Sequence, residues 1–201
     1  MTKLLSRRID GAYMRGFNIA LSLTWLRIFA VPVIVLVYFL PLKEAHLVAT
    51  VFFALAAITD WLDGYVARSY KQVTKLGAFL DPVADKLLVS ISLITILSQN
   101  YMPWLALPAA IIVGREIVIS ALREWMAEVG RRASVKVSIL AKVKTVLQMF
   151  AIGTLLFYSG DRSGYFLDAG ALLLFIAAGL TLWSMVIYIK IAWPDLTLSD
   201  K

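Results

Sequence analysis

The chain has 201 residues, of which 61% are hydrophobic and only 16% are charged. Soluble chains carry about 45–50% apolar and about 25% charged residues, and a domain of this size cannot bury so large an apolar excess. The composition therefore excludes an ordinary soluble domain and a disordered chain, and it indicates a membrane protein. The net charge of +7 then indicates basic cytoplasmic loops and anionic lipid or substrate, with no nucleic acid partner. The absence of cysteine excludes disulfides, thiolate nucleophiles and cysteine metal sites.

The N-terminal segment, residues 1–16, interleaves basic side chains with apolar ones such as Leu4, Ile9 and Tyr13. This pattern predicts an amphipathic segment at the membrane interface. A cleaved signal peptide is disfavoured, because the apolar run that follows is too long and no small-residue cleavage site precedes the next apolar stretch.

Six apolar stretches follow, each close to the length of about 20 residues that spans a bilayer: 19–40, 47–66, 79–98, 104–126, 143–158 and 165–191. Because their connections are mostly short, we expect neighbouring helices to form antiparallel hairpins. The fold class predicted is an all-α integral membrane protein with six transmembrane helices. One domain is expected over 17–192, with a cytoplasmic tail at 193–201.

Lysine and arginine gather on one side of the predicted helices, which marks that side as cytoplasmic. This side holds the N-terminal segment, the connection around Lys71 and the basic connection through Arg131 and Arg132, whereas only Lys43 and Arg162 lie on the other. Both termini are therefore expected in the cytoplasm.

Four aspartates lie near the cytoplasmic ends of two consecutive predicted helices, Asp60 and Asp63 on one, Asp81 and Asp85 on the next. An aspartate inside a membrane costs about 2.5–3.5 kcal/mol on insertion scales, so something must compensate the four. Spacings of three and four residues place each pair on one helix face. Asp63 and Asp81 are each nine residues from Gln72 in the turn, so the pairs are expected at similar depth.

Nearby basic side chains are not expected to neutralise this cluster, because only Arg68 and Lys86 are close in sequence. Divalent cations are then predicted, and all-oxygen ligands favour Mg²⁺ or Mn²⁺, with two ions as in phosphoryl-transfer sites. The alternative is a buried salt-bridge or proton-relay cluster of the kind found in transporters. Small residues on the same faces fit either close helix packing or room for a phosphorylated ligand: Gly64, Ala67 and Gly77.

These residues form a longer motif: Asp60-x2-Asp63-Gly64-x2-Ala67-Arg68-x8-Gly77-x3-Asp81-x3-Asp85. Its eight fixed positions make it specific, and it resembles the signature of the CDP-alcohol phosphotransferase family of membrane enzymes. The resemblance runs from Phe17 to about Tyr188, and the stretches 77–86, 115–128 and 142–145 are similar to bacterial members.

The resemblance implies transfer of a phosphatidyl group from CDP-diacylglycerol to an alcohol, with release of CMP. It implies one metal ion on Asp60, Asp63 and Asp81. A second ion would be reached by Asp60, Asp81 and Asp85, and Asp85 would also take the acceptor's hydroxyl proton. It further implies a homodimer in the bacterial inner membrane, with the active site facing the cytoplasm. The implied nucleotide pocket is lined by Asn18, Thr24, Asp63, Gly64, Ala67, Arg68 and Gly77, with Ala20 where the family usually has proline.

Basic residues on later helices predict an acceptor that carries a phosphate. Arg115 lies inside an apolar run, where an unpaired guanidinium is costly, so it needs an anion. Glu116 is expected to point about 100° away from it on a helix, which makes a substrate phosphate a candidate partner. Arg123, Lys142 and Lys144 would complete the phosphate clamp, which suits glycerol 3-phosphate better than neutral serine or choline.

The expected reaction therefore gives phosphatidylglycerophosphate and CMP. Two alternatives stay open, namely another acceptor (phosphatidylglycerol, inositol phosphate or serine) and an ion-coupled transporter. A transporter would carry polar residues on to the far face, whereas the outer halves of the predicted helices are almost wholly apolar. The only histidine, His46, lies in a loop remote from the aspartates, which removes Ser-His-Asp catalysis and histidine nucleophiles.

Overall fold

A computed structural model describes residues 19–70, 75–99, 101–128, 139–158 and 164–198, with side chains except at 19–20, 61–70, 75, 78, 139–141 and 194–198. The predicted interfacial segment, residues 1–16, lies outside these ranges. Within them every predicted apolar stretch is helical, and no strand occurs. The elements are α2 (Ile19–Tyr38), α3 (Ala45–Tyr70), α4 (Lys75–Ser98), the 3₁₀ turn η1 (Pro103–Leu105), α5 (Ala106–Glu128), α6 (Ile139–Phe157) and α7 (Gly164–Leu198).

The last helix is longer than expected. It continues to Leu198, past the end of the apolar stretch at 191 and into the predicted tail. A helix does not have to stop where its apolar residues stop, because its backbone hydrogen bonds close within the helix in water as well as in lipid.

Three of the described helical segments are long and apolar enough to cross a membrane: Leu21–Tyr38, Pro103–Glu128 and Gly164–Trp193. The apolar part of α3, Ala45–Asp60, is shorter. Large apolar side chains stand on the outer surface, as expected of faces that meet lipid, and Leu36 and Phe150 are 69% and 66% exposed. Several apolar helices thus indicate a membrane protein, and the number of six transmembrane helices stays a prediction.

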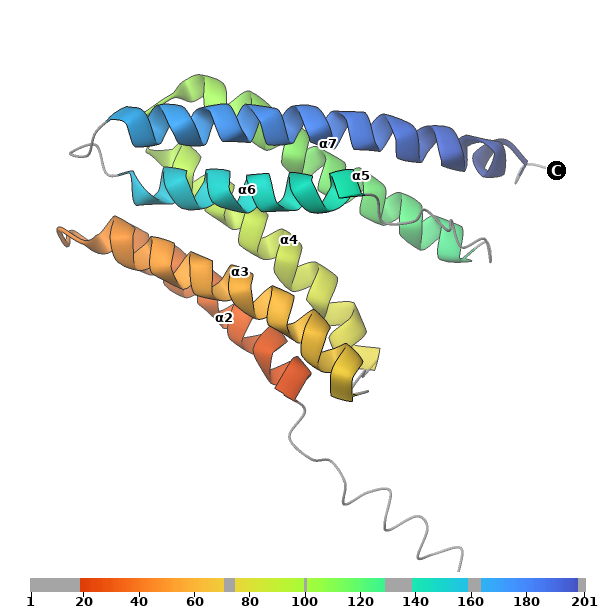
Figure 1. Cartoon of the computed structure of the whole chain (residues 1–201), viewed down its shortest axis with the longest axis horizontal. Helices are drawn as coiled ribbons and strands as arrows, with labels where there is room; N and C mark the ends of the chain where they lie inside the picture. The colour runs from red at the N-terminus through yellow and green to blue at the C-terminus, as the bar shows by residue number, and fades with distance from the viewer. Residues whose placement is uncertain (1–18, 71–74, 100, 129–138, 159–163, 199–201) are drawn as a thin grey trace, which may run out of the picture.

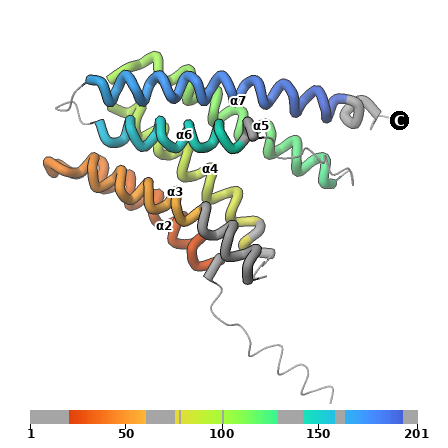
Figure 2. The backbone as a smooth tube through the Cα atoms, viewed as in Figure 1, coloured from red at the N-terminus to blue at the C-terminus, as the bar shows by residue number. Residues whose placement is uncertain are grey.

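Two helix pairs, α2 with α3 and α6 with α7, make the largest contacts of the bundle (Figure 1). The tube view shows α4 crossing behind α6 (Figure 2), and α4 packs against α2 and α6. The expected hairpin of α3 and α4 is not closely packed, because these helices make little direct contact and α2 lies against both. The two helices that carry the aspartates are therefore joined mainly through α2.

The buried face of α2 explains how it joins them. Thr24, Arg27, Val31, Ile34 and Tyr38 are all buried and recur at intervals of three and four residues, which places them on one side of the helix. Val31, Ile34 and Tyr38 belong to the apolar core. The two polar residues at the start of this face lie beside the aspartates of α3 and α4.

Candidate active site

Arg27 of α2 contacts two of the predicted metal-binding aspartates. Its Nη1 atom lies 3.0 Å from Oδ1 of Asp60 on α3. The same atom donates a hydrogen bond to Oδ1 of Asp85 on α4. The side chain of Arg27 is fully buried, whereas those of Asp60 and Asp85 are 41% and 43% exposed. The two carboxylates thus share one cation on their buried side and keep another side open.

Asp81 is held by a second residue of α2. The hydroxyl of Thr24 donates a hydrogen bond of 2.5 Å to its Oδ1 atom. Thr24 precedes Arg27 by one turn, as Asp81 precedes Asp85, so α2 and α4 run in the same direction at this point. Thr24 was expected in the nucleotide pocket, and the structure places its hydroxyl on a carboxylate.

The expectation that no nearby cation neutralises the aspartates is wrong for Asp60 and Asp85, because Arg27 binds both. Arg27 is distant in sequence and reaches them only through the packing of α2. A signal for it was present, since Arg27 is a charged residue inside the apolar stretch 19–40. Arg27, like Arg115, is a guanidinium within an apolar stretch and therefore needs an anion.

A pocket of about 160 Å³ opens beside these carboxylates, between residues of α3, α4, α5 and α6. Its walls carry both signs of charge, with acidic side chains from three helices and ammonium groups from α4 and α6. The lining residues are Asp60, Asp85, Lys86, Val89, Glu116, Lys144, Thr145, Gln148 and Met149.

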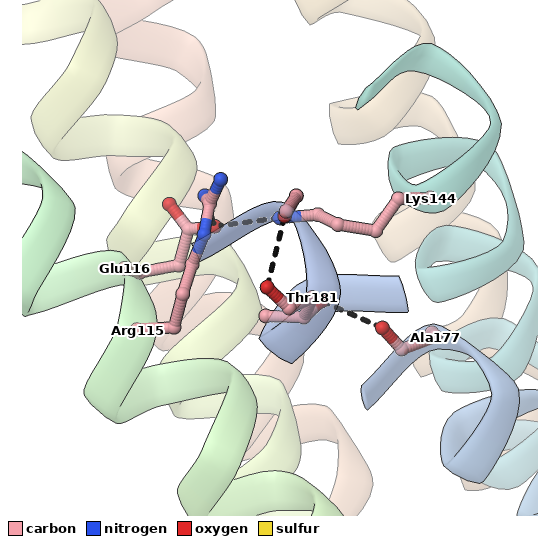
Figure 3. Close-up of polar contacts among 6 residues, drawn as sticks. Arg115, Glu116, Lys144, Ala177 and Thr181 are labelled. Carbon is pink, nitrogen blue, oxygen red and sulfur yellow. Dashed lines mark hydrogen bonds and ion pairs between the residues drawn. The ribbon is translucent and has the colours of Figure 1, made fainter. Parts of the chain in front are cut away.

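Glu116 of α5 lies at the centre of the basic side (Figure 3). Its Oε1 atom accepts a hydrogen bond of 2.9 Å from Nη1 of Arg115 and one of 3.2 Å from Nζ of Lys144 on α6. Lys144 is only 4% exposed, and the hydroxyl of Thr181 on α7 points toward it (Figure 3). The expectation that Glu116 points away from Arg115 is wrong, because the long side chains bend toward each other despite the angle between their starting directions.

Of the predicted acceptor residues, only Lys144 lines the pocket, and Arg115 contacts its wall through Glu116. The guanidinium of Arg123 lies over the ring of Tyr188, 5.3 Å from its centroid, and Lys142 is exposed. Of the predicted nucleotide residues, Gly77 is buried in α4. Asn18 and the side chains of the rest lie outside the described residues: Asp63, Gly64, Ala67 and Arg68.

Gln148 is a pocket residue that the sequence analysis missed. It is 4% exposed and lies one turn after Lys144 on α6, so both side chains share a helix face. A polar amide inside the apolar stretch 143–158 was the available signal.

Divalent cations fit the acidic side by the chemistry of its donors. Carboxylate oxygens are the ligands that Mg²⁺ and Mn²⁺ prefer, and Asp60 and Asp85 already converge on one positive charge. Among the described residues, no group of three or more His, Cys, Asp or Glu side chains is gathered closely enough to hold a metal ion. The side chain of Asp63 lies outside the described residues, and the carboxylate of Asp81 accepts a hydrogen bond from Thr24.

An all-helical membrane protein with carboxylates on one wall of a pocket and a buried ammonium on the other is suited to chemistry on a charged substrate. Residues 17–189 match the family model of CDP-alcohol phosphatidyltransferases, and the chain belongs to this family, as its motif predicted.

Its relatives include proteins named CDP-diacylglycerol–glycerol-3-phosphate 3-phosphatidyltransferase. Those of Escherichia coli K12 and Salmonella choleraesuis SC-B67 are each 49% identical over 180 residues, which cover 90% of this chain and 97% of the relative. The Haemophilus influenzae protein of this name is 47% identical over 176 residues, 88% of this chain and 94% of the relative.

Proposed function

We propose that the protein transfers the phosphatidyl group of CDP-diacylglycerol to glycerol 3-phosphate, giving phosphatidylglycerophosphate and CMP. The observation that carries the proposal is the identity of 47–49%, over nearly the whole chain, to relatives named for this reaction. The pocket supports it, because it sets Asp60 and Asp85 on one wall and the buried Lys144 on another. An acceptor with a reacting hydroxyl at one end and a phosphate at the other needs groups of this kind.

On the acidic side, Asp60, Asp81 and Asp85, together with Asp63, would hold divalent cations, which the family generally uses. Mg²⁺ or Mn²⁺ bound there would offset the negative charge of the donor diphosphate and of the leaving CMP. Two ions are proposed at this site. A nucleotide pocket beside it is proposed to be lined by Asn18, Thr24, Asp63, Gly64, Ala67, Arg68 and Gly77.

Asp85 would act as the general base. It lines the pocket, and its carboxylate is only partly enclosed. In this role it takes the proton of the acceptor hydroxyl while that oxygen attacks the phosphorus of the phosphatidyl group. The bond from this phosphorus to the CMP oxygen then breaks, CMP leaves with the bonding electron pair, and Asp85 later releases the proton to solvent.

On the basic side, Lys144 and Arg115 would bind the acceptor phosphate. Both already contact Glu116, so two cations face one anion and the cluster attracts a further negative charge. Burial of Lys144 strengthens this attraction, because water screens it less. Arg123 and Lys142 are proposed as further phosphate contacts.

The proposed setting is the bacterial inner membrane. Six transmembrane helices over 17–192 would place the pocket and both termini toward the cytoplasm, with residues 1–16 at the interface and 193–201 as a tail. A homodimer is proposed as the assembled form.

The test supplies the purified protein, in detergent, with CDP-diacylglycerol and radiolabelled glycerol 3-phosphate. We expect a labelled, phosphorylated lipid and an equal amount of CMP. Serine, inositol phosphate and phosphatidylglycerol are offered as competing acceptors in the same assay. CMP release with one of these alone would reassign the acceptor, and no CMP release with any acceptor would overturn the transferase.

A further inference from the structure

Arg27 is the side chain that connects the two aspartate-bearing helices. The helices α3 and α4 make little direct contact, whereas α2 packs against each of them. One atom of α2, Nη1 of Arg27, contacts Oδ1 of Asp60 on α3 and Oδ1 of Asp85 on α4. The two carboxylates therefore lie side by side because a shared guanidinium holds them there.

The guanidinium and the two carboxylates stabilise one another. A guanidinium that is fully removed from solvent is stable only beside anions, and breaking such a buried ion pair is strongly destabilising. Two carboxylates that approach each other without a cation repel, and one of them would have to take up a proton. Arg27 thus needs Asp60 and Asp85, and they need a positive charge at all times.

The two faces of the carboxylate pair differ in access. Arg27 occupies the buried face and is 0% exposed, whereas Asp60 and Asp85 are 41% and 43% exposed and line the pocket. A cation from solvent reaches the pair from the pocket face without displacing Arg27. The site can therefore carry a permanent charge behind the carboxylates and an exchangeable one in front.

We propose that Arg27 is a resident counter-ion of this site. It keeps Asp60 and Asp85 together when no divalent cation is bound, and it weakens their affinity for that cation by offsetting part of their charge. The inference rests on the proposed function in one respect, which is that divalent cations are the ligands of this pair. In this role Arg27 is a positioning residue, since among the described residues it contacts the two carboxylates.

The test compares thermal unfolding of the wild-type protein and Arg27→Gln in detergent, each in EDTA and in Mg²⁺ or Mn²⁺. In EDTA the variant should unfold at a lower temperature than the wild type, because its carboxylates repel. Metal should raise the unfolding temperature of the variant by several degrees more than that of the wild type, since binding to the native state stabilises it. A titration followed by the electron paramagnetic resonance of Mn²⁺ should show binding about tenfold tighter in the variant, as expected when a like charge is removed from the site.

Arg115→Gln is the matched control, because it makes the same chemical change at a guanidinium that pairs with Glu116 instead. It should shift the unfolding temperature equally with and without metal. Arg27→Lys, which keeps the charge, should behave nearly as the wild type. If Arg27→Gln does not yield folded protein in EDTA, the proposal requires that the same variant be recovered folded when purified in Mn²⁺.

Equal metal-induced shifts in the wild type and Arg27→Gln would overturn the inference, and so would unchanged Mn²⁺ affinity. The assay of phosphatidyl transfer by the wild type is a separate arm. If the wild type catalyses transfer but the wild type and Arg27→Gln respond equally to metal, the role of Arg27 is overturned and the proposed function stands. If the wild type shows no transfer with any acceptor, the proposed function is overturned.

Discussion

On the acidic side of the pocket one guanidinium, that of Arg27, contacts two carboxylates, whereas on the basic side one carboxylate, that of Glu116, contacts a guanidinium and an ammonium. Each side has an internal counter-ion that offsets its charge only in part. Within these contacts the first side has two carboxylates for one guanidinium, and the second has two basic groups for one carboxylate. A divalent cation would complete the first side, and the phosphate of the acceptor would complete the second.

The two counter-ions differ in access. The Arg27 side chain is 0% exposed, and it ties together three helices, α2, α3 and α4. The Glu116 side chain is 26% exposed, lines the pocket and, among the described residues, joins α5 to α6. A ligand can therefore add to the acidic side without reaching Arg27, whereas an acceptor phosphate would compete directly with Glu116 for its cations.

Removing divalent cations should have the largest effect on phosphatidyl transfer, because nothing would then offset the negative charge of the donor diphosphate and the leaving CMP. We expect EDTA to reduce phosphatidyl transfer below detection and added Mg²⁺ or Mn²⁺ to restore it. The fold should persist in EDTA, because Arg27 still holds Asp60 and Asp85, and thermal unfolding measures this. Transfer that resists the chelator would contradict the metal site.

Asp85→Asn should lower kcat by about 10²–10⁴-fold, the usual contribution of a general base. Measurement of CMP release checks this, and an unchanged elution profile in detergent shows that the protein still folds. Asp168→Asn on α7 is the control, because that aspartate is exposed and does not line the pocket. Activity retained in Asp85→Asn would remove the base assignment.

Lys144→Met removes one of the two positive charges of the basic side. It should raise KM for glycerol 3-phosphate by about 10- to 100-fold, since a buried charge that meets a phosphate is lost. The KM for CDP-diacylglycerol should change little, because the donor diphosphate is assigned to the acidic side. Lys190→Met on α7 is the exposed control. Equal increases in both KM values would place Lys144 outside the acceptor site.

Glu116→Gln removes the internal counter-ion of the basic side, as Arg27→Gln does on the acidic side. The variant should unfold at a lower temperature than the wild type, and glycerol 3-phosphate should then stabilise it by several degrees more. Glu128→Gln, at the exposed end of α5, should match the wild type in both respects. Identical stabilisation of Glu116→Gln and wild type would show that the phosphate binds elsewhere.

Gln148→Leu should have the smallest effect. We expect its amide to bind the hydroxyl of the acceptor that does not react, and such a hydrogen bond is worth about 3- to 10-fold in kcat/KM. The wild type should prefer glycerol 3-phosphate over an analogue that lacks this middle hydroxyl, and the variant should lose the preference. A preference that survives the substitution would assign the hydroxyl to another residue.

The aspartate motif and the helices were predictable from sequence because both depend on residues close together in the chain. Apolar runs of near-membrane length predict helices, and spacings of three and four residues place carboxylates on one face. The partners of these carboxylates were not predictable in this way, since Arg27 and Asp85 are 58 residues apart. Even the contact between the neighbours Arg115 and Glu116 did not follow from the helical angle between them, because their side chains are long and flexible enough to meet.

Composition and local spacing are properties of the chain alone, so they were enough to predict the class of this protein, its helices and the aspartates of its family motif. Which charges meet depends on how the helices pack. This packing set α2 between α3 and α4, gave Asp60 and Asp85 a common guanidinium, and gathered Glu116 and Lys144 on the walls of the same pocket. The physical reason is that a buried charge requires an opposite one within a few ångströms, and only helix packing brings such pairs together.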